Sequence, residues 1–85
     1  IEGTLPTHQK RAIKMWIKSN YSNSIRKYLT KYKHIKLYID IHGKIVKTQT
    51  EKNNSWSIIR PLKKSFIQLP KHLRNSKNMI ITLKQ

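Results

Sequence analysis

HIKLYIDI, residues 34–41, is the stretch that decides the fold of this chain. Its side chains alternate in character: Ile35, Leu37, Ile39 and Ile41 are apolar, and Lys36, Tyr38 and Asp40 fall between them. Successive side chains of a β-strand point to opposite faces of a sheet. This stretch therefore predicts a strand with one face in a core and one face in solvent.

An amphipathic helix is predicted immediately before this strand. Its apolar stripe falls at i, i+3, i+4 and i+7: Ile25, Tyr28, Leu29 and Tyr32. This spacing places the four side chains on one helix face. The helix is preceded by three residues of types that favour the N-cap position: Ser22, Asn23 and Ser24.

Residues 11–18 allow two interpretations. Ile13, Met15 and Ile17 alternate as in a strand, whereas Ile13, Trp16 and Ile17 have helical spacing. We favour the strand.

The chain after residue 41 predicts a turn, a hairpin, a second helix and a last strand. His42 and Gly43 form the turn, residues 44–50 return as a hairpin strand, and residues 51–55 form a loop. The helix begins near Pro61 and is ended by Pro70. Its apolar positions are Leu62, Phe66 and Leu69, and the terminal strand has its own alternation at Met79, Ile81 and Leu83. The order strand, helix, strand, helix, strand indicates a single α+β domain over residues 1–85, with one sheet.

The charge of the chain indicates a polyanionic partner. Nineteen Lys and Arg residues against three acids, Glu2, Asp40 and Glu51, give a net charge of +16 over 85 residues. Phosphate backbones neutralise such charge and release condensed counterions when they bind it. There is no cysteine, and we expect no cofactor, no metal site and no membrane association.

The chemistry of the chain favours binding over catalysis, with one enzymatic alternative. No acid lies near a histidine in a plausible catalytic constellation, and the four histidines lack metal-ligand spacing. A small toxin-like ribonuclease could still use Lys31, Lys33 and His34 for acid–base chemistry and charge stabilisation. We interpret these three residues instead as phosphate contacts of a protein that is not an enzyme.

Aromatic residues interleaved with cations are a second nucleic-acid signal. Tyr38 falls on the polar side of its strand and is the best stacking candidate, whereas Tyr28 and Tyr32 fall on the predicted core face of the helix. Trp16 and Trp56 fit either role. The complete set of candidate RNA-binding residues is Lys10, Arg11, Lys14, Lys18, Arg26, Lys27, Lys31, Lys33, His34, Lys36 and Tyr38.

The order of these motifs resembles the family of small-subunit ribosomal protein S-ten. The resemblance begins with Leu5-Pro6-Thr7 and a strand ending at Ser19, and continues with a basic helix containing Arg26 and Tyr28. It ends with His34 opening a strand that closes in Ile39-Asp40-Ile41, then Leu69-Pro70 and the terminal strand. It covers about two-thirds of the chain. Asn20 stands where the family has a proline after the serine, residues 42–60 are longer than the family's connection, and no glycine follows Pro70.

The resemblance implies a fold, a place and a role. The fold is a partial ferredoxin-like sandwich, in which a basic helix packs on a small sheet that carries a protruding hairpin. The place is the small ribosomal subunit, and the role is structural, in contact with ribosomal RNA and neighbouring ribosomal proteins. Residue usage typical of AT-rich genes favours a mitochondrial or other organellar ribosome, with the cytoplasm of a low-GC organism as the alternative.

The family also has a first strand and helix that this chain lacks. We therefore expect upstream residues or a second chain to supply them. Without them, the strand at residues 34–41 would have an unpaired edge.

A second resemblance concerns residues 66–74, which are similar to the strand and turn of AbrB-type transcription factors. These bind DNA as dimers with swapped hairpins. The resemblance explains fewer residues and leaves the N-terminal half without a role.

Overall fold

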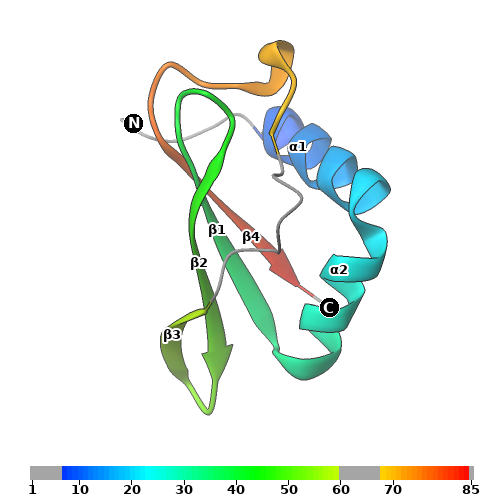
Figure 1. Ribbon diagram of the computed structural model, residues 1–85, viewed down its shortest axis with the longest axis vertical. Helices are drawn as coiled ribbons and strands as arrows, with labels where there is room; N and C mark the ends of the chain where they lie inside the picture. Colours follow the sequence, from blue (N-terminus) through cyan, green and yellow to red (C-terminus); the bar gives the residue numbers. More distant parts are fainter. Residues whose placement is uncertain (1–6, 60–67, 85) are drawn as a thin grey trace.

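Two helices pack on one face of a four-stranded antiparallel sheet, so the α+β class is confirmed (Figure 1). The computed structural model describes residues 7–59 and 68–84. The helices are α1 (Thr7–Asn20) and α2 (Ser22–Lys31). The strands are β1 (His34–Ile39), β2 (Ile45–Lys52), β3 (Ser55–Ile59) and β4 (Met79–Lys84), in the sheet order β3-β2-β1-β4. Both described α-helices precede the first described strand, so the predicted order, which begins with a strand and then a helix, is wrong at its first element.

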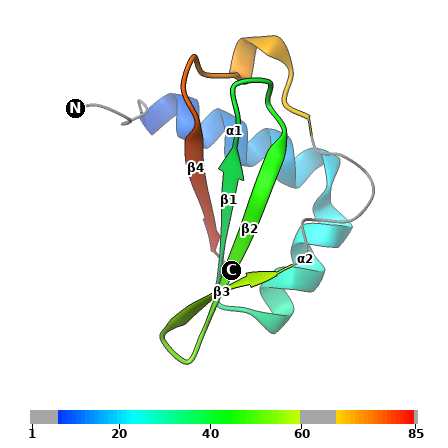
Figure 2. The ribbon, with the colours of Figure 1, turned by 60° about the vertical axis from the view of Figure 1, so that its left-hand side comes forward.

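β1 is an inner strand of the sheet and pairs on both sides. Its Leu37 lies opposite Thr48 of β2 and Ile81 of β4. The expected unpaired edge at this strand is therefore wrong, because the C-terminal strand returns to pair with it. Figure 2 shows β1 between β2 and β4, with α1 crossing behind them.

α1 replaces the strand that the alternation favoured at residues 11–18. Ile13 and Ile17 are fully buried and Trp16 packs against the core, whereas Met15 is 65% exposed. A strand would have placed Met15 on the same face as the two isoleucines. Residues 11–18 form a helix because a helix can pack its Ile13, Trp16 and Ile17 against the sheet, which gives the two-layer fold its second layer.

α2 confirms the predicted helix, although its start differs from the prediction. Ile25 and Leu29 are buried, and Tyr28 packs against them. Tyr21 occupies the N-cap position, where no side chain caps the helix by a hydrogen bond, and the predicted cap residues 22–24 lie inside the first turn. The Tyr21 amide donates to Ile17 and the Ile25 amide donates to Tyr21. The backbone of α1 thus leads almost directly into α2.

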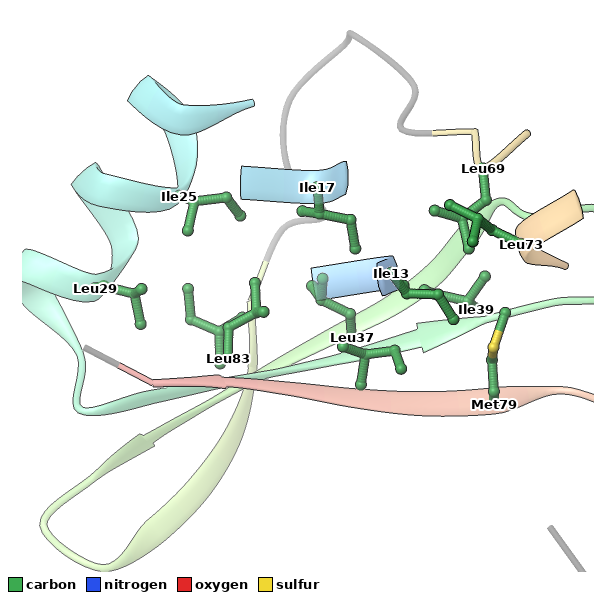
Figure 3. Packing of buried hydrophobic residues seen from close by; sticks show 12 residues of the cluster. Ile13, Ile17, Ile25, Leu29, Leu37, Ile39, Leu69, Leu73, Met79 and Leu83 are labelled. Atoms are coloured by element: carbon green, nitrogen blue, oxygen red, sulfur yellow. The ribbon is translucent and has the colours of Figure 1, made fainter. Parts of the chain in front are cut away.

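The core lies between the two helices and the inner face of the sheet (Figure 3). Every second residue of β1 and β4 points into it, as the alternation predicts. Its twelve members are Ile13, Ile17, Ile25, Leu29, Ile35, Leu37, Ile39, Leu69, Leu73, Met79, Ile81 and Leu83. Ile41, which the sequence places on this face, is 47% exposed because β1 ends at Ile39.

A tight turn connects β1 to β2, and Asp40 organises it. The Asp40 carboxylate accepts the backbone amides of His42 and Lys44, both at 2.9 Å. Gly43 follows in the left-handed region at φ 80°, which favours glycine. The predicted turn at His42 and Gly43 is confirmed.

The segment 68–74 packs against this turn. The Leu69 amide donates to the Gly43 carbonyl at 2.9 Å, and Arg74 Nε donates to the Leu69 carbonyl at 2.8 Å. Leu69 was predicted at the end of a helix, but it lies between an isolated bridge at Gln68 and a short 3₁₀ turn, Lys71–Leu73. The rest of that predicted helix, and residues 66 and 67 of the AbrB-like stretch, lie outside the described residues.

A hairpin links β2 to β3 at the opposite end of the sheet. Asn53 and Asn54 form its turn, both with positive φ, as suits a two-residue hairpin connection. The predicted loop at residues 51–55 is therefore a two-residue turn, and β3 is a strand that the sequence did not indicate. Figure 1 shows this hairpin projecting from the end of the sheet.

Candidate nucleic-acid interface

The sheet has an outer face, turned away from α1 and α2. Strand alternation places the helix-facing side chains in the core, so the remaining side chains of each strand form this second surface. The registers of the three strand pairs bring them into adjacent rows. The outer face comprises His34, Lys36, Tyr38, Lys47, Gln49, Glu51, Trp56, Ile58, Ile80, Thr82 and Lys84.

Two aromatic rings on the outer face each have a lysine ammonium group over them. Lys36 Nζ lies 4.2 Å from the centroid of Trp56, and Lys47 Nζ lies 4.8 Å from that of Tyr38. Both distances are within the range of cation–π attraction. The Tyr38 hydroxyl also donates to Gln49 Oε1 at 2.6 Å, which fixes the position of its ring. The rings are thus held on the surface beside positive charge.

A histidine–carboxylate pair lies beside Trp56. His34 Nδ1 and Glu51 Oε1 are 2.5 Å apart, and the His34 ring is stacked at 6.3 Å from Trp56 with an interplanar angle of 21°. The prediction that no acid lies near a histidine in a plausible constellation is therefore wrong. The two residues are 17 positions apart in the chain, and only the antiparallel pairing of β1 and β2 brings them opposite each other.

The two described acids, Asp40 and Glu51, already form contacts within the chain. The pKa of the Asp40 carboxyl lies below its ordinary value. The cause is the hydrogen bonds that it accepts, first from the backbone amide of Lys44 and then from that of His42. Glu51 contacts His34. With three acids for nineteen Lys and Arg residues, most cations have no acidic counterpart within the chain.

The structure divides the predicted RNA-binding residues between two surfaces. His34, Lys36 and Tyr38 lie together on the outer face of the sheet. The others belong to the helical layer: Lys10, Arg11, Lys14 and Lys18 on α1, Arg26, Lys27 and Lys31 on α2, and Lys33 in the connection to β1.

The helical-layer cations are largely in solvent. Arg11, Lys18, Arg26, Lys27, Lys31 and Lys33 are exposed, whereas Lys10 and Lys14 are half-buried. Lys27 and Lys31 line a hollow of about 550 Å³ along α2, together with Tyr28 and Tyr32. The rings of Tyr28 and Tyr32 are stacked at 6.5 Å. Tyr32, predicted for the core, instead lies half-buried beyond the end of α2.

Sequence reasoning missed the residues that β2, β3 and β4 add to the outer face. Lys47, Gln49 and Glu51 alternate with Thr48 and Thr50, which are buried. Since both sets are polar, hydropathy could not indicate which side faced outward. Knowledge of the strand pairing is needed to find them.

The described residues also bear on metal binding and on membrane insertion. Residues 7–59 and 68–84 contain no group of three His, Cys, Asp or Glu residues that could hold a metal ion. Neither described helix is long and apolar enough to cross a bilayer.

The chain was also compared with known proteins. No protein-family model, no curated protein and no solved structure matches it.

Proposed function

We propose that this protein binds RNA, with unpaired nucleotides held on the outer face of its sheet. The observation that carries the proposal is the pairing of Trp56 and Tyr38 with lysine ammonium groups on one surface. Nucleobases stack on aromatic rings, and the adjacent cations attract the phosphates that link them. A net charge of +16 supports a polyanionic ligand over a protein or a small molecule.

The helical layer supplies the second part of the proposed interaction. Its exposed cations include Arg11 and Arg26, and its Lys31 Nζ lies 5.5 Å from the ring centroid of Tyr32, farther than in the two lysine–ring pairs of the sheet. Lysine and arginine contacts to phosphate position a nucleic acid without reading its sequence. We therefore assign phosphate neutralisation to the helices and base stacking to the sheet.

The test is a substitution that removes the stacking ring and keeps an apolar side chain at this position. Trp56→Leu should weaken binding of a fluorescein-labelled single-stranded RNA by about 5- to 150-fold, since stacking contributes about 1–3 kcal/mol per base. Fluorescence anisotropy at constant salt measures the loss. Trp56 is 38% exposed and lies on β3, an edge strand of the sheet, so the fold should tolerate the change.

Two controls accompany this measurement. Trp56→Phe keeps an aromatic face and should retain most of the affinity. Met15→Leu changes an exposed apolar residue of α1, in the helical layer, and should bind like the unmodified protein. Equal affinity of Trp56→Leu and the unmodified protein would remove the sheet from the interaction.

We propose that the bound RNA is the ribosomal RNA of the small subunit of an organellar ribosome. Support comes from the S-ten resemblance at residues 34–41 and at Leu69-Pro70, and from charge spread over both layers. The portion of the resemblance that implied a strand ending at Ser19 gives no support, since α1 occupies those residues.

Sedimentation tests the ribosomal assignment. In a lysate of the source cells, the protein should co-sediment with small ribosomal subunits and dissociate when salt is raised. A protein found only in the slowly sedimenting soluble fraction at low salt would contradict it.

RNA cleavage is a second candidate function, favoured by the His34–Glu51 pair. A carboxylate bonded to one ring nitrogen can orient a histidine for acid–base work. Lys31 and Lys33 share a hollow of about 260 Å³ with Glu51. We rank it second because the pair offers one acid–base unit, whereas in-line cleavage uses a base and an acid on opposite sides of the phosphorus. Shortening of the labelled RNA that stops with His34→Ala would favour cleavage.

A further inference from the structure

Glu51 stands out on the outer face because its charge opposes the proposed ligand. It is the acid that the described part of this face carries, on a chain with a net charge of +16. A carboxylate beside a phosphate backbone weakens binding by repulsion. Asp40, the other described acid, has a clear structural role, since it accepts two backbone amides in the β1–β2 turn.

The Glu51 carboxylate is oriented through one of its two oxygens. Its Oε1 is held by His34 Nδ1 at 2.5 Å. Its Oε2 makes no hydrogen bond to any residue in the ranges 7–59 and 68–84. The side chain is 19% exposed, so it is partly desolvated yet reachable. An ionised carboxylate forms only accepting hydrogen bonds, and those it forms with N–H donors are strong.

The surroundings of Glu51 suit the other parts of a nucleotide. Trp56 lies opposite Glu51 in the β2–β3 pair and offers a surface for a base. Lys31 and Lys33 line the same hollow of about 260 Å³ as Glu51 and offer cations for a phosphate. Directly opposite side chains of an antiparallel pair have Cβ atoms about 4.5–5.5 Å apart, so a base held near Trp56 would lie within reach of the carboxylate.

We propose that Glu51 selects guanine among the unpaired bases bound on the outer face. This inference rests on the proposed RNA binding and deepens it. Guanine has two adjacent N–H donors, N1–H and the N2 amino group, on its Watson–Crick edge. Oε2 of Glu51 would accept from one of them, and Oε1 would accept from the other through the lone pair that His34 does not use. Adenine and cytosine offer one amino group beside a ring-nitrogen acceptor. Uracil offers N3–H between two carbonyl oxygens, which repel a carboxylate.

A purely structural role for Glu51 predicts a different result. If the carboxylate served only to hold His34, its neutralisation would raise the affinity for every RNA by the same factor, through reduced repulsion. Base selection requires instead that the effect depend on which base is present.

The experiment compares oligouridine with the same oligomer carrying one central guanosine, adenosine or cytidine. Binding to the full chain is measured by fluorescence anisotropy at one salt concentration. The guanosine oligomer should bind about 5- to 150-fold more tightly than oligouridine, the range expected for a good bidentate pair. Glu51→Ala should abolish this preference, and Glu51→Gln should reduce it without weakening binding to oligouridine.

Asp40→Asn is the matched control, since it removes a negative charge outside the outer face and keeps an acceptor oxygen in the turn. It should leave the guanosine preference unchanged. Tight binding of all four oligomers with equal affinity would overturn the selection by Glu51 and leave RNA binding intact, as would a guanosine preference that survives in Glu51→Ala. Failure to bind any of the oligomers would overturn both proposals.

Discussion

RNA affinity should fall about 10³- to 10⁵-fold when salt is raised from 50 to 200 mM, if six to ten phosphates are contacted. The physical reason is counterion release, because nineteen Lys and Arg residues face only three acids. Anisotropy titrations at several salt concentrations give the slope of log affinity against log salt. A nearly flat slope would contradict an interaction based on phosphate contacts.

Two variants separate the charge contribution from stacking in the same titrations. Lys27→Gln combined with Lys31→Gln removes two exposed cations of α2, and the slope should become shallower by about 0.7–0.9 for each phosphate that is no longer neutralised. Trp56→Leu should lower the affinity by a similar factor at every salt concentration, because stacking releases no counterions.

Gly43→Ala should reduce the free energy of unfolding by roughly 2–5 kcal/mol, combining the cost of a left-handed backbone with that of overpacking. Gly43 has φ 80°, and a Cβ there would lie 2.9 Å from the Leu69 carbonyl oxygen and 3.0 Å from Arg74 Nε. The change would therefore also disturb the Leu69–Gly43 backbone hydrogen bond. Urea denaturation followed by circular dichroism measures the loss.

His42→Ala is the control for this prediction. His42 is the exposed neighbour of Gly43 in the same turn, and its hydrogen bonds in the turn come from its backbone. Loss of its side chain should change the free energy of unfolding by less than about 0.5 kcal/mol. Equal unfolding midpoints for Gly43→Ala and the unmodified protein would show that the 68–74 segment does not pack tightly against the turn.

The elements that the sequence predicted correctly are those with one unambiguous period. β1 alternates strictly, β4 alternates apart from Ile80, and the stripe of α2 at Ile25, Tyr28 and Leu29 has only helical spacing. α1 was mistaken because Ile13 and Ile17 are compatible with both periods, and only the position of Trp16 or Met15 distinguishes them. β3 was missed because it has only five residues and its alternation, Ser55, Trp56, Ser57, Ile58, ends at a second isoleucine.

The candidate site likewise contains residues that the sequence could reveal and residues that it could not. Lys36 and Tyr38 could be recognised because they alternate with apolar residues within one strand, whose pattern reveals both faces. Lys47, Glu51 and Trp56 belong to the same surface, yet nothing in their local sequence indicates it. The platform of two cation-flanked rings exists only once β2 and β3 pair with β1.

By itself, the sequence determined the class of the fold, the strand at residues 34–39, the helix that precedes it and the excess of positive charge. These properties depend on side-chain periodicity and composition, which are local. Only the tertiary structure decided that residues 7–20 form a helix, that β4 pairs with β1, and that His34 meets Glu51 beside Trp56. These outcomes depend on contacts between residues far apart in the chain. The free energy of such contacts cannot be inferred from a local pattern of side chains.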